Sequence, residues 1–397
     1  MPNAARPDSF AGGAARFSVE SRSKLAHESR QFMLHPMRTV SVPLAGRSYS
    51  ILIGAGLLPS LGAECNNLGL GRRCAVISDS RVAPEYGQAA LASLQHGGFE
   101  PTLLRIPAGE TAKRLRIVER CYGKLAAHRL ERNSFIVALG GGVVGDLAGF
   151  VAATYLRGID FVQVPTTLLA QVDSSVGGKV GVNLPAGKNL VGAFHQPRLV
   201  LCDLDTLKTL PPRELRAGLA EVIKYGIIYD AQFFTRLERD LPRLLKLDRE
   251  CLVEVVARCC EIKAEVVSQD ERESGLRSIL NFGHTIGHAL EAISGYGKYL
   301  HGEAIAIGQV AAARLSERQL GLSTADVMRI QTAFTAAGLP TKVRLTKAQV
   351  SRLFDAMRVD KKVAGGEIKF VLAKRIGEVV PGQQVAPAVI AEALAAC

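Results

Sequence analysis

Three of the chain's eight histidines lie within one short stretch, "LNFGHTIGHALEAISGYGKYLHGEA" at residues 280–304. His284 and His288 are four residues apart and share one face if the stretch is helical, which is the spacing of a two-histidine zinc site. Thr285 stands where a zinc metalloprotease would carry glutamate. A catalytic zinc site needs three protein ligands, one of which can be a carboxylate, and an open position. The candidate ligands are His284, His288, His301, Glu303 and Glu221 of "GLAEVIKYG". Spacing alone does not choose among them, and histidines that fill a helical core are the alternative.

A glycine-rich turn lies further upstream, in "FIVALGGGVVGDLAG". Gly140, Gly142 and Gly145 have the G-x-G-x-x-G spacing, directly after an apolar strand and at the start of a helix. In that context bare backbone can approach a pyrophosphate, and the helix N-terminus favours its negative charge. A tight strand-to-helix turn without a ligand is the alternative. The motif follows the third or fourth predicted strand, whereas the usual Rossmann motif follows the first. Its acidic residue, Asp146, stands directly after the last glycine of the motif. These departures favour a Rossmann-like fold with a non-standard topology.

Two further stretches are suited to binding anions. In "PAGETAK", residues 107–113, Glu110 and Lys113 flank a turn. The second stretch, residues 164–197, is expected to be a long irregular segment, and such segments inside a compact domain are usually functional. It contains polar side chains and lysines around a Gly-Gly pair, where a ligand can approach the backbone closely. The residues are Thr166, Thr167, Asp173, Gly177, Gly178, Lys179, Lys188 and Asn189. A solvated loop is the alternative.

Strand-like and helix-like runs alternate from Met37 to about residue 205, as in "RCAVIS" followed by "PEYGQAALASLQHGG". Such alternation predicts helices packed on a mainly parallel sheet. From "TLPPREL" onward helical patterns dominate to residue 358, and two prolines mark the first helix start. We therefore predict an α/β nucleotide-binding domain over residues 37–210, followed by an all-α metal- and substrate-binding domain over residues 211–397.

The first 36 residues differ from the rest of the chain. They are mostly small and polar residues with scattered arginines, and their apolar residues show no clear periodicity. This composition predicts an extended start or a disordered tail, and an organelle-targeting address is the alternative. Met37 stands directly before the first strand-like run, so it is a second possible start of the chain.

The composition is that of an ordinary globular protein, with 48% apolar and 22% charged residues over 397 positions. No run of eighteen apolar residues occurs, which argues against a membrane span. The net charge of +12 comes from lysines and arginines spread along the chain, without tryptophan. This pattern argues against nucleic-acid binding and suits attraction of small anionic substrates. Eight cysteines without a CxxC pair suit buried thiols in a reducing cytoplasm.

Five ordered motifs resemble those of the 3-dehydroquinate synthases, which are the shikimate-pathway members of the sugar-phosphate cyclases and serve chorismate and aromatic amino acid biosynthesis. The motifs are "GGGVVGDLAGFVAATYLRG", "VPTTLLAQVDSSVGGKVGVN", "GLAEVIKYG", "NFGHTIGHALE" and "HGEA". The resemblance runs from about Met37 to the C-terminal end. It implies an NAD-binding α/β domain, a helical domain that binds one divalent metal (zinc or cobalt), and an active site in the cleft between them, usually in a homodimer.

Carried over motif by motif, the resemblance implies that Glu221, His284 and His301 are the metal ligands. His288 would then lie beside the substrate phosphate instead. The catalytic and substrate-binding residues would be Lys224, Asp173, Lys179, Arg277, Lys263, Asn281, His288, Asn189, and Lys361 or Lys362 of "VDKK". Arg157 would reach the active site of the neighbouring subunit.

The resemblance also implies a set of NAD contacts in the first domain. These fall at Asp79, Gly109, Glu110, Thr111, Lys113, Gly142, Val143, Val144, Gly145, Asp146, Thr166, Thr167, Lys179, Lys188, Thr206, Leu207, Lys208 and Thr209. Lys179 and Lys188 would lie where nucleotide and substrate meet.

The implied reaction converts the seven-carbon acid phosphate DAHP to the carbocycle 3-dehydroquinate and phosphate. NAD would take hydride from one ring carbon, and the resulting ketone would acidify the neighbouring C–H so that phosphate leaves by β-elimination. Hydride would then return before ring opening and an intramolecular aldol closure. The metal would act as a Lewis acid, Lys224 would steer the alkoxide from the same helical face as Glu221, and Asp173 would hold a hydroxyl. The departing phosphate would itself be the base.

Three other functions stay open from the sequence. Cyclases of glucose 6-phosphate or sedoheptulose 7-phosphate are similar, but their substrates lack a carboxylate, so the paired cations Lys263 and Arg277 favour the acid substrate. Polyol dehydrogenases share a nucleotide domain and a helical metal domain, and would release NADH at each turnover. A binding or structural protein that kept the fold without turnover is the third.

Overall fold

The computed structural model describes residues 37–295, 298–359 and 368–395. Its seven-stranded sheet has the order β1-β2-β9-β6-β5-β3-β4. The strands β1 and β2 form an antiparallel hairpin, and the other neighbouring pairs are parallel. The sheet strands are β1 (Arg38–Val42), β2 (Tyr49–Gly54), β3 (Arg73–Asp79), β4 (Glu100–Ile106), β5 (Phe135–Gly140), β6 (Asp160–Pro165) and β9 (Leu199–Asp203). The predicted mainly parallel sheet is confirmed, and its strand order differs from the usual Rossmann order.

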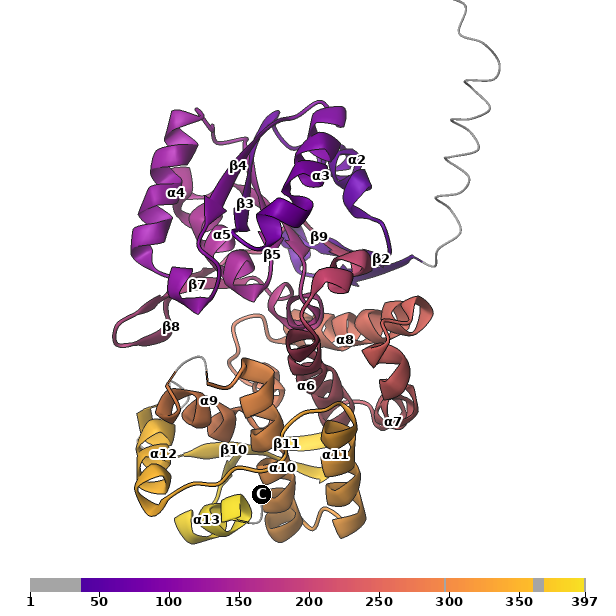
Figure 1. Cartoon of the computed structure of the whole chain (residues 1–397), viewed down its shortest axis with the longest axis vertical. Coiled ribbons are helices and arrows are strands. Elements are labelled where there is room, and N and C mark those ends of the chain that lie inside the picture. Colours follow the sequence, from indigo (N-terminus) through magenta and orange to yellow (C-terminus); the bar gives the residue numbers. More distant parts are fainter. Residues whose placement is uncertain (1–36, 296–297, 360–367, 396–397) are drawn as a thin grey trace, which may run out of the picture. The chain divides into compact units, whose positions relative to one another are not determined.

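Helices cover both faces of the sheet, because successive side chains along a strand point to opposite faces. Cys74 and Val76 of β3 pack with α2 and α3, whereas Ala75 and Ile77 pack with α4 and α5. Figure 1 shows the two helix pairs on opposite sides of the strands. The covering helices are α2 (Leu61–Asn67), α3 (Val82–His96), α4 (Leu115–Ala127) and α5 (Gly142–Thr154). The sheet is therefore the middle layer of a three-layer α/β arrangement, as the alternating sequence pattern predicts.

Helices dominate the chain after the sheet, as predicted. They are α6 (Pro212–Ile228), α7 (Ala231–Leu245), α8 (Arg249–Gln269), α9 (His284–Ile293), α10 (His301–Leu320), α11 (Thr324–Ala336), α12 (Lys347–Val359) and α13 (Pro387–Ala395). The helix α10 packs against α6, α9, α11 and α13 and is buried along most of its length. A helix that is apolar on nearly every side occupies the centre of its layer. His301, which the family resemblance implies is a metal ligand, is the first residue of this helix and is therefore held by a rigid element.

Local sequence signals explain where several of these helices begin and end. The side chains of Asp230, Asp248 and Ser323 accept hydrogen bonds from backbone N–H groups in the first turns of α7, α8 and α11. Such caps satisfy donors that have no partner within the helix. Gly321 ends α10 in the left-handed conformation that glycine adopts without steric cost.

A two-stranded antiparallel hairpin within the helical part is not predicted from the sequence. It consists of β10 (Lys369–Arg375) and β11 (Glu378–Gln384), and β10 packs against α10 (Figure 1). The fold class is confirmed, and the hairpin is an addition to an otherwise helical layer. The strand β11 contains Pro381 and Gly382, which weaken a strand pattern in the sequence.

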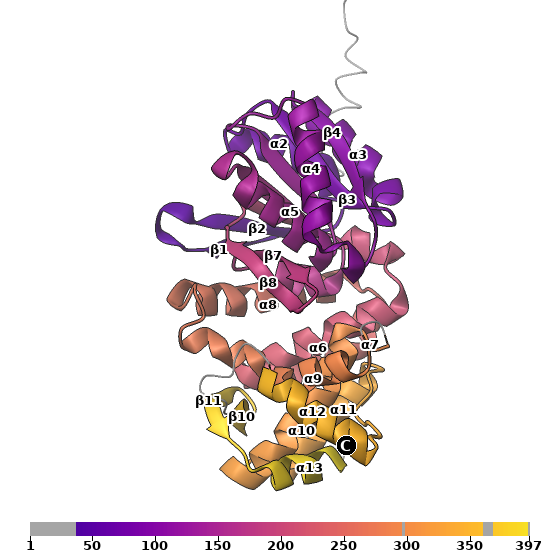
Figure 2. The same ribbon diagram turned by 90° about the vertical axis from the view of Figure 1, so that its left-hand side faces the viewer.

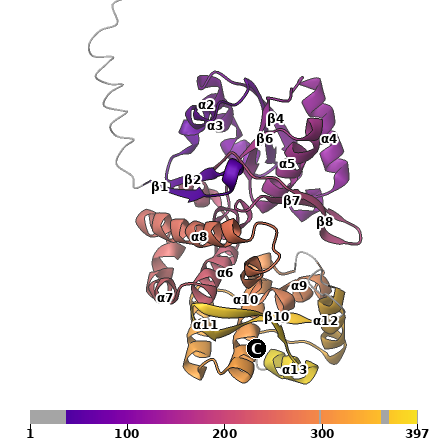
Figure 3. The same ribbon diagram turned by 180° about the vertical axis from the view of Figure 1, so that it is seen from behind.

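The helical part meets the sheet along its first hairpin. The helix α8 lies beside β1 and β2, as Figure 3 shows from behind. Val40 and Val42 of β1 and Ile51 and Ile53 of β2 are buried there in the same apolar cluster as Val256 of α8. The helix α8 thus covers one face of this end of the sheet, because these alternate side chains all point to that face.

The stretch at residues 164–197 is more regular than the sequence analysis expects. A π-helical turn at Ala170–Ser174 leads into an antiparallel hairpin, β7 (Lys179–Leu184) and β8 (Gly187–Phe194), which packs against α5 (Figure 2). The expectation of an irregular loop is therefore wrong. The many glycine, alanine and asparagine residues hide the strand pattern, although Val180 and Val182 alternate and are buried.

Three predictions about the limits of the chain and its domains stand as follows. Residues 1–36 lie outside the described residues, so neither view of that segment is tested. The boundary near residue 210 stays a prediction. Among the described residues, none of the helices is long and apolar enough to cross a membrane.

The contact between α6 and α10 depends on Gly302. A Cβ atom at this residue would lie 1.9 Å from the backbone oxygen of Ala217 in α6. We expect Gly302→Ala to push the two helices apart and to lower the free energy of unfolding by about 1–3 kcal/mol, as overpacking does elsewhere. The melting temperature followed by circular dichroism measures this loss.

Gly123 in α4 provides the matched control for this prediction. A Cβ atom there would meet no other atom within 4 Å, so Gly123→Ala is expected to stabilise the helix by about 0.5–1 kcal/mol. A Gly302→Ala protein that melts as the wild type does would contradict the close helix contact.

Candidate active site

The carboxyl ends of the parallel strands meet beside a cleft of about 2040 Å³. Here β3 lies between β4, which follows it in the chain, and β5, which comes later. Open α/β sheets bind their ligands at such a topological switch point. Asp79 at the end of β3, Gly109 after β4, Gly142 after β5 and Thr166 after β6 all line the cleft.

Most of the predicted site residues line this cleft. They are Asp79, Gly109, Glu110, Lys113, Gly142, Val143, Asp146, Thr166, Thr167, Asp173, Lys179, Lys188, Asn189, Thr209, Lys263, Arg277, Asn281, His288 and His301. Glu221, Lys224 and His284 are buried directly behind it. Lys361 and Lys362 lie outside the described residues. Residues from widely separated parts of the chain thus converge on one cavity.

Some predicted NAD contacts are not on the cleft wall within the described chain. Val144 is buried in the core beneath α5, and Leu207 is buried in the core that the helices share. The Thr206 hydroxyl donates to the backbone oxygen of Asp203 at 2.6 Å. A Cβ atom at Gly145 would lie 2.8 Å from Gln163 Oε1, so this glycine lets α5 approach β6. The contacts of these residues with NAD stay predictions.

Three more predicted residues also lie off the wall. Lys208 pairs with Asp205 at 2.9 Å, and Thr111 lies in the turn after β4. Arg157 is exposed and has a positive φ of 71°. Its predicted reach into a neighbouring subunit is not tested by a single chain.

Lys113 ties the turn after β4 to the glycine turn and to the hairpin. Its ammonium group forms an ion pair with Asp146 and a hydrogen bond with Asn189 Oδ1. Burial raises the pKa of Asp146, and the Lys113 charge opposes that effect. Asn183 of β7, which the sequence analysis does not single out, joins the network by donating to Glu110 at 2.7 Å and accepting from the Asn189 backbone at 2.8 Å. The turn and the hairpin therefore form one polar wall of the cleft.

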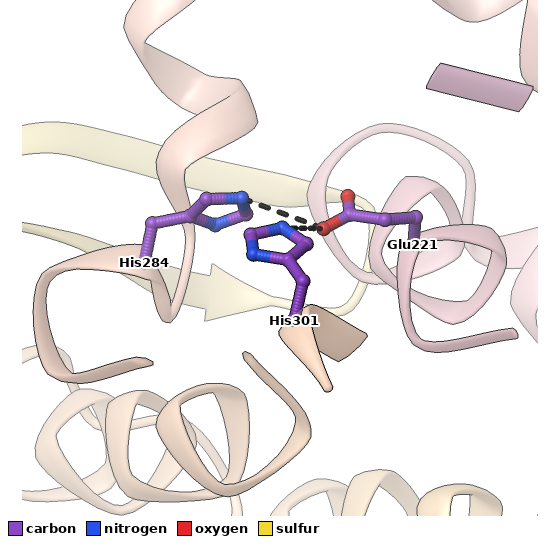
Figure 4. A group of neighbouring side chains, drawn as sticks. All are labelled: Glu221, His284 and His301. Atoms are coloured by element: carbon purple, nitrogen blue, oxygen red, sulfur yellow. Dashed lines mark ion pairs between the residues drawn. The ribbon is translucent and has the colours of Figure 1, made fainter. Parts of the chain in front are cut away.

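The three predicted metal ligands point toward one another from three helices (Figure 4). Oε1 of Glu221 in α6 lies 3.4 Å from Nε2 of His284 and 3.5 Å from Nε2 of His301. The Nδ1 atom of His284 lies 3.1 Å from the backbone oxygen of Phe282. A carbonyl only accepts, so that nitrogen carries the proton and Nε2 keeps its lone pair toward Glu221. The side chains thus present three donor atoms to one point.

The geometry of this set fits a divalent cation. Ligands placed tetrahedrally at 2.0–2.1 Å from zinc are about 3.3–3.4 Å apart, close to the observed separations. Glu221 has no exposed surface, and its oxygens accept no hydrogen bond of ordinary geometry. Lys224, one turn further along α6, forms an ion pair with its Oε2 atom. A buried carboxylate with an oxygen directed at two imidazoles is a donor set for zinc or cobalt.

The histidines of the set differ in charge. Burial lowers the pKa of His284 to about 3, so this ring is neutral and able to ligate. Burial also disfavours the charged form of His301, but the nearby carboxylates of Glu221 and Glu291 outweigh it and raise its pKa to about 9. The two carboxylates therefore favour positive charge at this point, which a bound cation would supply.

Buried cations line another part of the cleft. Lys263 is 5% exposed, and its ammonium group lies 2.7 Å from Asp173 Oδ1. The Tyr225 hydroxyl donates to the same oxygen at 3.1 Å. Burial raises the pKa of Asp173, but the charges of Lys263 and Lys224 outweigh it and lower the pKa to about 2. Asp173 is therefore an ionised acceptor at the cleft wall.

Arg277 reaches the cleft from the segment between α8 and α9. Its guanidinium group donates to the backbone oxygen of Glu271 at 2.5 Å and to that of Gly177 at 3.3 Å. A Cβ atom at Gly177 would lie 2.5 Å from Arg277 Nη2, so the close approach expected at this glycine serves an arginine. Asp270 holds the segment by accepting from the backbone of Arg277 at 3.0 Å.

The structure also gives the positions of the alternative metal ligands. Glu303 pairs with Arg213 at 2.7 Å and accepts from the Leu300 backbone at 2.9 Å, so it caps α10. His288 lies beside the other two histidines and lines the cleft. Glu273, which sequence reasoning missed, pairs with Lys179 and accepts from Asn281 at 2.9 Å. The sequence around Glu273 gives no signal of these two contacts. Lys179 is remote in the sequence, and the contact with Asn281 depends on how the turn between the two residues folds.

Comparisons with known proteins identify the family of this chain. The family description "3-dehydroquinate synthase N-terminal" matches residues 103–217, and "3-dehydroquinate synthase C-terminal" matches residues 218–363. The 3-dehydroquinate synthase of Desulforamulus reducens is 52% identical over 343 residues, which cover 86% of this chain and 95% of that protein.

Two solved structures resemble the fold over nearly its whole described length. The 2-epi-5-epi-valiolone synthase ValA of Streptomyces hygroscopicus, with NAD+ and Zn2+ bound, has a TM-score of 0.81 and 28% identity, and the match covers 88% of this chain and 96% of ValA. A 2-deoxy-scyllo-inosose synthase complexed with carbaglucose-6-phosphate, NAD+ and Co2+ has a TM-score of 0.80 and 30% identity, with 90% and 99% covered. The matched regions and the identity over most of the chain show that the protein belongs to the 3-dehydroquinate synthase family.

Proposed function

We propose that the protein converts DAHP to 3-dehydroquinate and phosphate, using NAD and one divalent cation, zinc or cobalt. The observation that carries the proposal is the convergence of Glu221, His284 and His301 on one point beside a cleft that also holds buried cations. The family membership supports the same reaction. The product differs from DAHP by one phosphoric acid, so the enzyme is a lyase without net oxidation.

The cofactors would occupy the two sides of the cleft. Gly109, Gly142 and Thr166 at the strand ends offer backbone and hydroxyl groups to the nucleotide. The cation would be held by Glu221, His284 and His301. When bound, NAD accepts a hydride and returns it, and the cation acts as a Lewis acid toward the reacting hydroxyls. NAD with zinc or cobalt in two similar cyclases supports this assignment.

The chain's own residues orient the substrate and stabilise charge. Asp173 is ionised and accepts a hydrogen bond from a substrate hydroxyl. Lys224, whose ammonium group is paired with Glu221, lies where it can stabilise negative charge that develops on the oxygen next to the cation. Such preorganised charges act strongly in a site with little water. The phosphate of the substrate is proposed as the base in its own elimination, so no side chain is assigned that task.

Substrate choice rests on the cations of the cleft. DAHP is a small molecule with a carboxylate at one end and a phosphate at the other. We assign these two groups to a set of cationic and polar side chains that holds both ends and so fixes the orientation of the reacting carbons. The set comprises Lys263, Arg277, Asn281, His288, Asn189 and one lysine of residues 361–362. Glucose 6-phosphate and sedoheptulose 7-phosphate lack the carboxylate and would leave Lys263 or Arg277 without a partner in the substrate.

Three further assignments belong to this proposal. We propose a homodimer in which the exposed Arg157 reaches the neighbouring active site. The cytoplasm is proposed as the location, because the free cysteines Cys65, Cys74, Cys121, Cys202, Cys251, Cys259 and Cys260 are all buried, as suits a reducing compartment. The domain boundary near residue 210 is supported by the end of the sheet at Asp203 and the start of α6 at Pro212.

An activity assay tests the proposed reaction directly. Purified protein given DAHP, NAD and Co2+ is expected to release phosphate and 3-dehydroquinate in equal amounts, with no net NADH. Removal of the metal by a chelator should reduce the rate to background, and added Co2+ or Zn2+ should restore it. Steady NADH formation from glycerol, without phosphate release from DAHP, would instead indicate a polyol dehydrogenase. Turnover of glucose 6-phosphate or sedoheptulose 7-phosphate but not DAHP would indicate another cyclase.

The ligand set is tested by replacing its carboxylate. Glu221→Gln removes the only negative ligand, so activity should fall to background and metal affinity should fall more than the roughly 10- to 100-fold typical for loss of an outer-shell partner. Metal content after dialysis, measured by mass spectrometry, gives the result. Glu303→Gln is the matched control, because Glu303 pairs with Arg213 and not with the histidines. Full metal content in Glu221→Gln would refute the proposed ligands.

A further inference from the structure

Glu291 is a buried carboxylate beside the proposed metal site to which neither the sequence nor the family resemblance gives a role. It lies in the last turn of α9 and is 9% exposed. Its Oε2 atom lies 3.1 Å from Nδ1 of His301, and its Oε1 atom lies 3.2 Å from Nζ of Lys188 in β8. It therefore joins a proposed metal ligand to a lysine of the hairpin that forms the opposite wall.

The two nitrogens of His301 face two different carboxylates. Nε2 lies 3.5 Å from Glu221, on the side of the proposed cation, and Nδ1 faces Glu291. A neutral imidazole that offers the lone pair of Nε2 to a cation must carry its proton on Nδ1, and that N–H needs an acceptor. Glu291 provides the acceptor at hydrogen-bond distance. His284 has the same arrangement with a backbone carbonyl, that of Phe282, at 3.1 Å.

A second cation is the competing explanation for the cluster. His288, Glu291 and His301 each present a possible ligand atom within 4.8 Å of one another. However, Nδ1 of His301 cannot both carry a proton and bind a second ion. The other oxygen of Glu291 already faces the ammonium group of Lys188, which supplies positive charge. The geometry is therefore that of a hydrogen bond, with its carboxylate balanced by a lysine.

We propose that Glu291 is a positioning residue for the metal site, an inference that rests on the proposed function. It fixes the tautomer and the ring orientation of His301, so that Nε2 faces the cation held with Glu221 and His284. Carboxylates behind ligating histidines raise their basicity and orient their rings. Through Lys188 the same carboxylate links this ligand to the hairpin wall of the cleft.

Binding of Co2+ tests this role without relying on activity. The probe is Co2+ added to the full-length protein after the metal has been removed by a chelator, with its affinity measured by competition against the chelator and its geometry by the visible absorption spectrum. Glu291→Gln is expected to weaken Co2+ binding by about 10- to 100-fold and to shift the absorption bands, since the ring of His301 is no longer held by a charged acceptor. Glu291→Asp keeps the charge but shortens the side chain, and should recover part of the affinity.

Controls separate positioning from loss of fold and from failure of the proposed function. Glu250→Gln makes the same chemical change at an exposed residue of α8 and should bind Co2+ as the wild type does. The melting temperature of each variant without metal shows whether it is folded. Folded Glu291→Gln with wild-type affinity and spectrum would overturn the inference while leaving the ligand set intact. A wild-type protein that binds no Co2+ would instead contradict the proposed function itself.

Discussion

The carboxylate of Glu221, buried completely in the middle of α6, is the constraint on which the helical part of the protein depends. Moving an ion of this kind out of water costs several kcal/mol unless partners compensate it. Lys224 provides one partner from the same helix. His284 and His301, the first residues of α9 and α10, face the same carboxylate, so the partly positive N-terminal ends of two helices lie beside the negative charge. The packing of these helices and the placement of the proposed metal ligands therefore depend on each other.

The fold could be predicted from local patterns to the extent that these patterns are periodic. Alternating apolar residues and helical runs predict the parallel sheet and its covering helices, because each buried strand is nearly continuous in apolar residues. The hairpins β7–β8 and β10–β11 were not predicted. Three of their strands contain glycine, proline or asparagine, which disfavour sheets, and both hairpins pack on helices, α5 and α10, that no local window contains.

The site could be predicted from the sequence only in part. The four-residue spacing of His284 and His288 indicates that both lie on one helix. In the structure, however, the two histidines that face Glu221 are His284 and His301, and His301 lies ten residues after Glu291 in the sequence. That choice depends on how α6, α9 and α10 pack, which spacing does not encode, and only the family resemblance supplied it. Glu273 was missed for the same reason, since the partner Lys179 lies 94 positions away.

Three lysines of the cleft share one further property that bears on recognition. Lys263 faces Asp173, Lys179 faces Glu273, and Lys188 faces Glu291, so each has a carboxylate of the protein within ion-pair distance. A substrate anion that enters must compete with these internal partners, and it gains only the difference between the two interactions. An anion with a single charged group can improve few of these contacts. A molecule with charged groups at both ends gains at several cations at once, so the pairing favours doubly anionic substrates over singly charged ones before any chemistry begins.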